Sequence, residues 1–237
     1  MEISPEKLSA VVERFKEDRT RIADAWHETH DTEACLNAHS AALDRAVLAL
    51  GSLAEFPSDG LAAVGGYGRR ELFPHSDIDL LVLLSDDRGE DEETKAKISA
   101  FLAALWELGL TVGAAVRTEK EFTAEAAEDV SIATTYLESR FLWGERTLYD
   151  ASRDDFFASA RAFFRDKMLE LRRRHQKYED TPYALEPNLK ESPGGLRDLQ
   201  VFLWCARAAG LADSLQGMKD ADLITEREMH TIEECFR

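Results

Sequence analysis

Residues 65–84 read Gly65-Gly66-Tyr67-Gly68-Arg69-Arg70-Glu71-Leu72-Phe73-Pro74-His75-Ser76-Asp77-Ile78-Asp79-Leu80-Leu81-Val82-Leu83-Leu84. A glycine turn comes first, then a short polar stretch, then an apolar run that Asp77 and Asp79 open. Successive side chains of a strand point to opposite faces, so both carboxylates are expected on the same face. The rest of the run is apolar on both faces, which is typical of a central strand covered on both sides.

Asp77 and Asp79 are the first candidate site. Two carboxylates at the start of a buried strand repel each other at close range unless a cation lies between them. Oxygen ligands without nitrogen or sulfur favour Mg²⁺ or Mn²⁺. The sequence therefore predicts a divalent-metal site at these two residues.

The composition limits the class of protein. The 237 residues carry a formal charge of −17, and the pI is about 4.8. Such acidity argues against a broad electrostatic footprint for nucleic acid, although a local basic groove stays open. The cysteines Cys35, Cys205 and Cys235 are far apart and form no CxxC pair, which suits a reducing cytoplasm. We find no signal peptide and no apolar stretch long enough to span a membrane.

Around the opening stretch the elements alternate. We expect helices over residues 5 to about 55, a turn at 57–60, a short buried strand at 61–64 and a helical turn at 69–73. A helix over 92–108 ends at Gly109, and 110–117 forms another strand. This alternation favours an α/β core over a helical bundle.

From about residue 120 the pattern is helical. The strongest apolar stripe comprises Phe156, Phe157, Ala160, Phe163, Phe164, Met168 and Leu171. A last stripe, Ile224, Met229, Ile232 and Phe236, stops at Arg237 without a terminating signal, so we expect a fragment of a longer protein. The expected domains are 1–57 (helical segment), 58–120 (α/β core) and 121–237 (helical subdomain, truncated at its C-terminal end).

The glycine turn and the carboxylates together suggest a chemistry. Gly65 and Gly66 can bring backbone N–H groups close to an anion, and Arg69 and Arg70 add donors. A metal on the two carboxylates could neutralise charge on the same phosphates, as attack on the α-phosphate of a nucleoside triphosphate requires. The alternative is a plain glycine turn before a strand, with Asp77 as a cap.

Gly65-Gly66 with Asp77-Ile78-Asp79 resembles the signature of the polymerase-β-like nucleotidyltransferase superfamily. The longer string from Gly65 to Leu81 resembles the N-terminal domain of the PII uridylyltransferase/uridylyl-removing family. A second string is similar to that family's second segment: Tyr183-Ala184-Leu185-Glu186-Pro187-Asn188-Leu189-Lys190-Glu191-Ser192-Pro193-Gly194-Gly195-Leu196-Arg197-Asp198-Leu199-Gln200. Residues 112–118 and 138–140 also fall where this family would place them.

The resemblance implies an α/β (α+β) nucleotidyltransferase core with a mixed sheet, flanked by N-terminal helices and a C-terminal helical subdomain. It implies transfer of UMP from UTP to a tyrosine of the PII nitrogen-regulatory protein. Asp77 and Asp79 would be the catalytic metal ligands, Gly65 and Gly66 would line the triphosphate, and Arg69 would help to hold it. The family's uridylyl-removing hydrolase and glutamine-sensing modules are not expected within these residues.

The sequence leaves four points open. Lys190 and Arg197 offer cations to phosphate, or else the segment 180–198 braces the helices through an internal Glu186–Arg197 pair. The superfamily's third carboxylate has no counterpart on the strand 110–117; Glu138 is the nearest candidate, and the general base is unassigned. The basic run Arg172 to His175, with Lys177, could bind phosphate or a partner, but a solvated helix face is favoured. Rival functions are transfer of another nucleotide or to another acceptor, and a catalytically impaired nucleotide-binding module.

Overall fold

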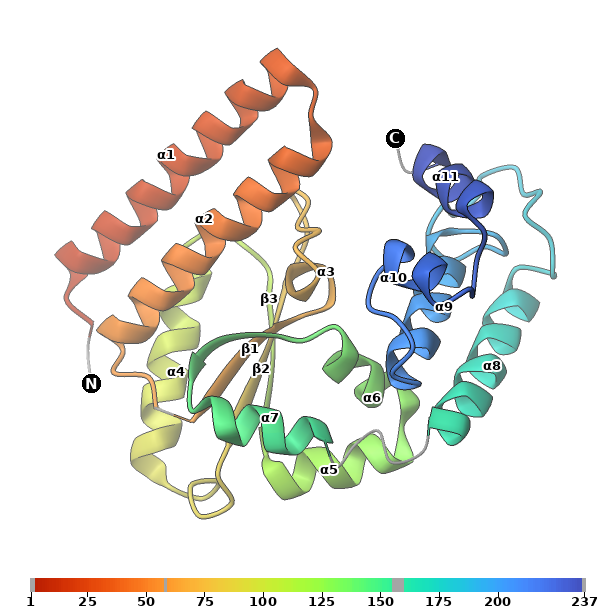
Figure 1. Ribbon diagram of the computed structural model, residues 1–237. Coiled ribbons are helices and arrows are strands. Elements are labelled where there is room, and N and C mark those ends of the chain that lie inside the picture. Colours follow the sequence, from red (N-terminus) through yellow and green to blue (C-terminus); the bar gives the residue numbers. More distant parts are fainter. Residues whose placement is uncertain (1–2, 58, 155–159, 236–237) are drawn as a thin grey trace. The chain divides into compact units, whose positions relative to one another are not determined.

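The computed structural model describes residues 3–57, 59–154 and 160–235. The chain divides into two compact units (Figure 1). The first consists of Met1–Glu128 and Glu138–Arg153, and the second of Asp129–Leu137 and Asp154–Arg237. Among the described residues, no helix has both the length and the apolar character needed to cross a membrane.

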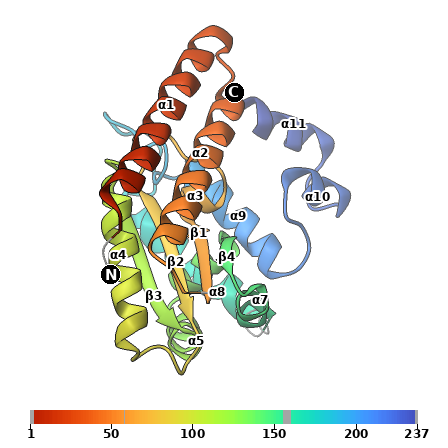
Figure 2. The ribbon, with the colours of Figure 1, turned by 90° about the vertical axis from the view of Figure 1, so that its left-hand side faces the viewer.

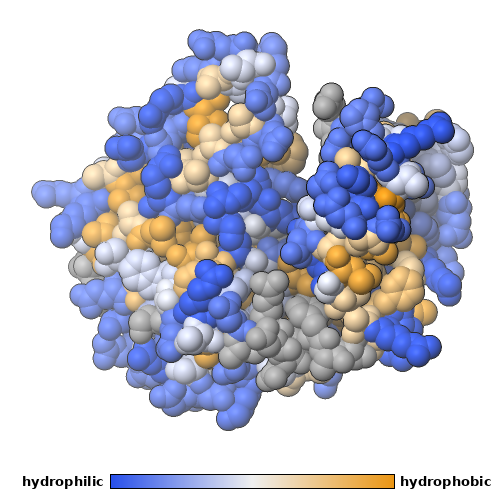
Figure 3. Space-filling model, in the orientation of Figure 1, coloured by the Kyte–Doolittle hydropathy of each residue, from blue (hydrophilic) through white to orange (hydrophobic). Residues whose placement is uncertain are grey.

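The N-terminal helices are α1 (Pro5–Thr29) and α2 (Thr32–Leu53), which lie side by side (Figures 1 and 2). Pro5 fits the first turn of α1, and His30 ends this helix in the left-handed region at φ 54°. Asp31 caps α2 by accepting a hydrogen bond of 2.9 Å from the Ala34 N–H. The helical prediction for this segment is therefore confirmed. Apolar residues reach the surface between the two helices in Figure 3.

The first unit contains a four-stranded mixed sheet, which confirms the predicted fold class. Its strands are β1 (Gly60–Val64), β2 (Ile78–Leu84), β3 (Val112–Thr118) and β4 (Arg140–Gly144), in the order β3-β2-β1-β4. β1 is antiparallel to β2 and β4, whereas β2 and β3 are parallel. The parallel pair needs a crossover, which α4 (Glu92–Trp106) supplies.

β2 is the central buried strand that the apolar run predicts. Ile78 and the five residues from Leu80 to Leu84 are all at most 2% exposed. The face that carries Ile78, Leu80, Val82 and Leu84 joins a core with residues of α2 and α4, among them Val47 and Phe101. This packing fixes the register of β2 and with it the position of the two aspartates at its start.

Two predictions in the first unit are wrong. The helical turn lies on the glycines, as α3 (Gly65–Gly68), and not on Arg69 to Phe73. Residues 140–144 form β4, inside a region predicted to be helical. Only Phe141, Leu142 and Trp143 are apolar there, too short a run to show a period, and pairing with β1 decides the conformation. The remaining helices of this unit are α5 (Glu119–Glu128) and α7 (Arg146–Asp154).

The second unit is helical. It contains α6 (Val130–Leu137), α8 (Ala160–Lys177), α9 (Leu196–Ala208), α10 (Leu215–Asp220) and α11 (Glu226–Cys235). Its core joins Phe163 of α8 to Val201, Trp204 and Ala208 of α9 and to Ala133 of α6. Phe156, Phe157 and Phe236, which the apolar stripes include, lie outside the described residues.

Candidate active site

Asp77 and Asp79 lie at the start of β2. Both are exposed, whereas Ile78 between them is completely buried. This alternation is the one expected for a strand whose first residues leave the covered part of the sheet. The two carboxylates are therefore accessible while their backbone is held by the core.

The carboxylate of Asp79 lies where three backbone segments meet. In the sheet, Asp79 is the register partner of Val64 on β1 and of Gly113 on β3. A Cβ atom on Gly113 would lie 2.6 Å from Oδ1 of Asp79, and one on Gly65 would lie 3.2 Å from Oδ2. Gly65 also has a φ of +58°, which disfavours a side chain. Glycine at both positions leaves the space that the carboxylate occupies.

A polar network fixes the glycine turn. Arg140 of β4 donates to both carboxylate oxygens of Asp44, at 2.9 and 3.0 Å, and to the backbone oxygen of Tyr67 at 3.2 Å. The Tyr67 hydroxyl donates to the same aspartate at 2.7 Å. Burial, together with Asp44, raises the pKa of Tyr67 well above its ordinary value, so this hydroxyl stays a donor. Helix α2 and strand β4 thus hold α3 from two sides.

Arg69 is engaged by two carboxylates. Its guanidinium donates to Glu138, and its Nε donates to Glu71 at 2.7 Å. Burial alone would lower the pKa of Arg69, but Glu138 and Glu71 outweigh burial and raise it. Glu138 is only 8% exposed. The residue considered for the third carboxylate therefore pairs with Arg69.

The donor set fits a magnesium ion that is shared with a substrate. Among the described residues, no group of three or more His, Cys, Asp and Glu side chains could hold a metal ion. Mg²⁺ is usually bound through one or two carboxylates together with water and substrate phosphates, rather than in a cage made by protein alone. Asp77 and Asp79 are both exposed, and the carboxylate of Asp79 lies beside the glycine turn, so the pair meets this requirement.

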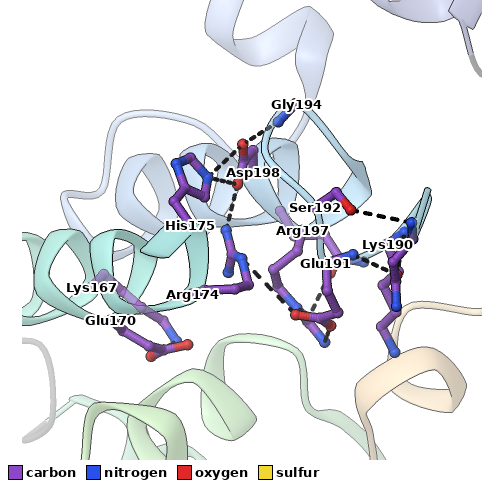
Figure 4. A network of polar contacts seen from close by, with 12 residues as sticks. Lys167, Glu170, Arg174, His175, Lys190, Glu191, Ser192, Gly194, Arg197 and Asp198 are labelled. Carbon is purple, nitrogen blue, oxygen red and sulfur yellow. Dashed lines mark hydrogen bonds and ion pairs between the residues drawn. The ribbon is translucent and has the colours of Figure 1, made fainter. Parts of the chain in front are cut away.

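The second sequence motif lies in the second unit and is largely bound to itself. Asp198 accepts from the Gly194 N–H at 2.7 Å and from Arg174, and Nε2 of His175 lies 2.9 Å from its Oδ1 (Figure 4). Burial opposes ionisation of Asp198, but the bonds from His175, Gly194 and Arg174 prevail and lower its pKa. The motif therefore braces the loop against α8.

The two cations of this motif, Arg197 and Lys190, differ in whether they pair with other side chains. Arg197 bonds to Glu191 and to Gln200, so its internal partner is Glu191 and not the expected Glu186. Lys190 is exposed and forms no ion pair with a described residue. Its assignment to the nucleotide stays a prediction. Within the basic run, Arg172 and Arg173 are exposed as expected, whereas Arg174 and His175 belong to the Asp198 network.

Sequence reasoning missed three residues of the first-unit site. Asp44 and Arg140 are 96 positions apart, and neither stands in a motif that predicts their pairing. Gly113 did carry a signal, because a glycine inside an apolar strand often marks a close approach of other groups. The sequence alone does not show that the approaching group is the Asp79 carboxylate.

Comparisons with known proteins agree with this geometry. Residues 44–137 match the family model described as a nucleotidyltransferase domain, and residues 162–237 match the one described as GlnD PII-uridylyltransferase. The bifunctional uridylyltransferase/uridylyl-removing enzyme of Cupriavidus pinatubonensis is 43% identical over 233 residues, which cover 96% of this chain. Those of Burkholderia vietnamiensis and Bordetella avium are 44% and 43% identical, over 95% and 99% of it.

The chain is homologous to the N-terminal part of these enzymes. It carries a nucleotidyltransferase domain, and the glycine turn and both aspartates lie within the matched residues. The chain spans only 27%, 26% and 28% of the three bifunctional uridylyltransferase/uridylyl-removing enzymes. The activities in their name belong to proteins that are more than three times as long as this chain.

Proposed function

We propose that this chain transfers UMP from UTP to a tyrosine hydroxyl of the PII nitrogen-regulatory protein and releases pyrophosphate, in a metal-dependent reaction. The observation that carries the proposal is the position of Asp79, whose carboxylate lies against the glycine turn at Gly65. Such a site can hold a metal and a phosphate next to each other. The choice of UTP and PII rests on the homologous enzymes and their names.

In this proposal Asp77 and Asp79 hold Mg²⁺ or Mn²⁺ together with the phosphates of UTP. The N–H groups of Gly65 and Gly66 and the side chains of Arg69 and Lys190 bind the triphosphate. When bound, the metal neutralises negative charge on the phosphate oxygens. Arg69 is already oriented by Glu71 and Glu138, so it can approach a phosphate without first losing its side-chain freedom.

The acceptor protein brings the nucleophile. The tyrosine oxygen attacks the α-phosphorus and its proton passes to water. The bond between the α-phosphorus and the oxygen that bridges to the β-phosphate breaks, and pyrophosphate leaves. The chain's own contribution is to fix the α-phosphate, which the network of Arg140 and Asp44 supports by holding the glycine turn. The free thiols of Cys35, Cys205 and Cys235 agree with a cytoplasmic location.

The test incubates the chain with PII, Mg²⁺ and UTP labelled at the α-phosphate. Wild type is compared with Asp79→Asn, which keeps the shape and removes the charge, and with Asp87→Asn, an exposed loop residue, as control. We expect label on PII with wild type and with the control, and near-total loss with Asp79→Asn at unchanged thermal stability. Parallel reactions with labelled ATP, CTP and GTP test the base.

One observation favours a second candidate, a nucleotide-binding module without transferase activity. Gly113 is the β3 partner of Asp79, and β3 (Val112–Thr118) carries no carboxylate that could complete a third metal ligand. Binding of UTP and Mg²⁺ without any transfer to PII would favour this candidate. Transfer of a different nucleotide would instead keep the enzyme class and change the substrate.

A further inference from the structure

The first unit contains a pocket of about 600 Å³ that the transferase proposal does not use. It lies among α1, α2 and the loop Phe73–His75, and this volume is typical of sites for small organic ligands. Its walls combine apolar side chains with a few polar ones, as ligand sites usually do. The pocket therefore has the size and the lining of a binding site.

The charge of the lining is unusual for this chain. Asp and Glu outnumber Lys and Arg by 46 to 29, yet the described lining residues include Lys16 and Arg19 and no acidic residue. Lys16 pairs with Glu13 at 3.0 Å, whereas Arg19 forms no ion pair with any described residue. Within the part of the chain that the structure describes, the Arg19 side chain donates only to the backbone oxygen of Pro74, at 2.9 Å. An uncompensated guanidinium at a pocket favours an anionic ligand.

His39 gives an independent indication of a ligand. It lines the pocket, is only 6% exposed, and makes no hydrogen bond to another described residue. Its ring nitrogens are not among the fully buried, unpaired polar atoms of the described residues, so they are accessible from the pocket. Burial, and next to it the charge of Arg19, lowers the pKa of His39, so the ring is neutral at pH 7 and can donate through one nitrogen and accept through the other. A ligand in the pocket could therefore form a hydrogen bond with this ring.

The apolar part of the lining indicates the rest of the ligand. Trp26 of α1 and Phe73 of the loop are 37% and 54% exposed although both line the pocket. Aromatic side chains of this kind gain most from contact with another ring. We propose that this pocket binds a small aromatic anion, with its charged group at Arg19, a polar group at His39 and its ring against Trp26 and Phe73.

This site is separate from the proposed nucleotide site but shares a segment with it. The loop Phe73–His75 ends two residues before Asp77, and the bond from Arg19 to Pro74 ties the same loop to α1. An occupied pocket would thus restrict the segment that leads into the metal ligands. Binding itself is independent of whether the chain transfers UMP.

The experiment titrates the whole chain with benzoate, phenyl phosphate and indole-3-acetate by calorimetry and by NMR of the histidine resonances. Benzyl alcohol, which lacks the charge, and acetate, which lacks the ring, are the ligand controls. We expect saturable binding of at least one aromatic anion, with a change at His39, and binding of both controls weaker by about tenfold or more. UTP with Mg²⁺ should not displace the probe.

Two variants test the location. Arg19→Gln should weaken binding about tenfold by removing the charge. Ala23→Trp fills the pocket from an exposed helix position and should abolish binding, while circular dichroism shows the fold intact. Lys7→Gln, an exposed charge on the same helix outside the pocket, is the matched control and should have no effect. The proposal is overturned by absence of saturable binding, by equal binding to Ala23→Trp, or by displacement with UTP.

Discussion

The carboxylate of Asp79 takes the place of a side chain at Gly113. The two residues are register partners on the parallel strands β2 and β3, and a Cβ on Gly113 would lie 2.6 Å from Oδ1 of Asp79. No real Cβ atom tolerates such a contact, so any larger residue at this position must move the carboxylate. The geometry of the proposed metal site therefore depends on a residue that contributes no ligand.

The first prediction follows from this contact. Gly113→Ala should displace the Asp79 carboxylate and lower kcat/KM for UMP transfer about a hundredfold, because small misplacements at a reacting centre are that costly. The free energy of unfolding should change little, because the atom that the new Cβ meets is the end of an exposed, flexible side chain. Gly51→Ala is the matched control, because its new Cβ would meet Phe56 at an ordinary 3.7 Å. Full activity of Gly113→Ala would contradict the assigned role of Asp79.

The second prediction concerns Glu138. If it serves Arg69 and not the metal, Glu138→Gln should lower the free energy of unfolding by about 1–3 kcal/mol, because a charged hydrogen bond in a buried position is weakened. The Mg²⁺ concentration that gives half-maximal transfer should stay unchanged. A large rise in that concentration would instead identify Glu138 as the third carboxylate.

The third prediction is a coupling between Asp44 and Arg140. A double-mutant cycle with Asp44→Asn and Arg140→Gln, followed by urea denaturation, should give a coupling energy of about 1.5–3 kcal/mol. Both side chains are largely buried, with 18% and 20% exposed. The control cycle uses Arg146 and Asp150, an exposed pair at 3.3 Å, and should give about 0.5 kcal/mol or less. Equal couplings in the two cycles would argue against a buried tether of the glycine turn.

The fourth prediction is a pH dependence in the second unit. The pKa of Asp198 is lower in the folded protein than its ordinary value of 3.8, so its ionisation stabilises the fold above pH 3.8. Asp198→Asn should therefore cost about 1–2 kcal/mol at pH 7. This difference should shrink as the pH falls below 3.8 and through the folded-state pKa, where the wild-type carboxylate also becomes protonated. Urea denaturation at several pH values measures it, and the exposed Asp213→Asn should show no such trend.

The fifth prediction tests Lys190. If its ammonium group binds the triphosphate, Lys190→Ala should raise the KM for UTP about tenfold, with a smaller effect on kcat. Arg173→Ala removes an exposed cation from α8 of the same unit and serves as the control. An unchanged KM in Lys190→Ala would exclude this residue from the nucleotide site and leave the motif with its bracing role alone.

Most of the core could be predicted from the sequence because its signals are local. Six of the seven residues of β2 are apolar and lie on both faces of the strand, and α4 presents a regular apolar stripe, so both elements could be predicted to within two residues of their observed bounds. β4 was missed because five residues with a central apolar triplet resemble a piece of helix as much as a strand. Only its partner β1, far away in the sequence, decides between them.

The same contrast between local and long-range signals holds for the residues of the site. The glycine turn and the aspartates stand close together in the sequence, so their common purpose could be inferred from spacing. The ties of Arg140 to Asp44 and of Arg69 to Glu138 join positions that are 96 and 69 apart, and pairings of that range leave no periodic signal. Lys190 lies within a sequence motif, but its side chain forms no ion pair with a described residue that would define its role.

The route of the chain through the first unit limits where this protein can be truncated. The first unit ends at Glu128 and resumes at Glu138–Arg153, which includes β4. A fragment that stops at residue 128 would lose β4 and expose the edge of β1, and a bare apolar edge pairs readily with other molecules. Such a fragment should aggregate during expression, so the shortest soluble fragment with the complete sheet has to include α6 and extend to Arg153.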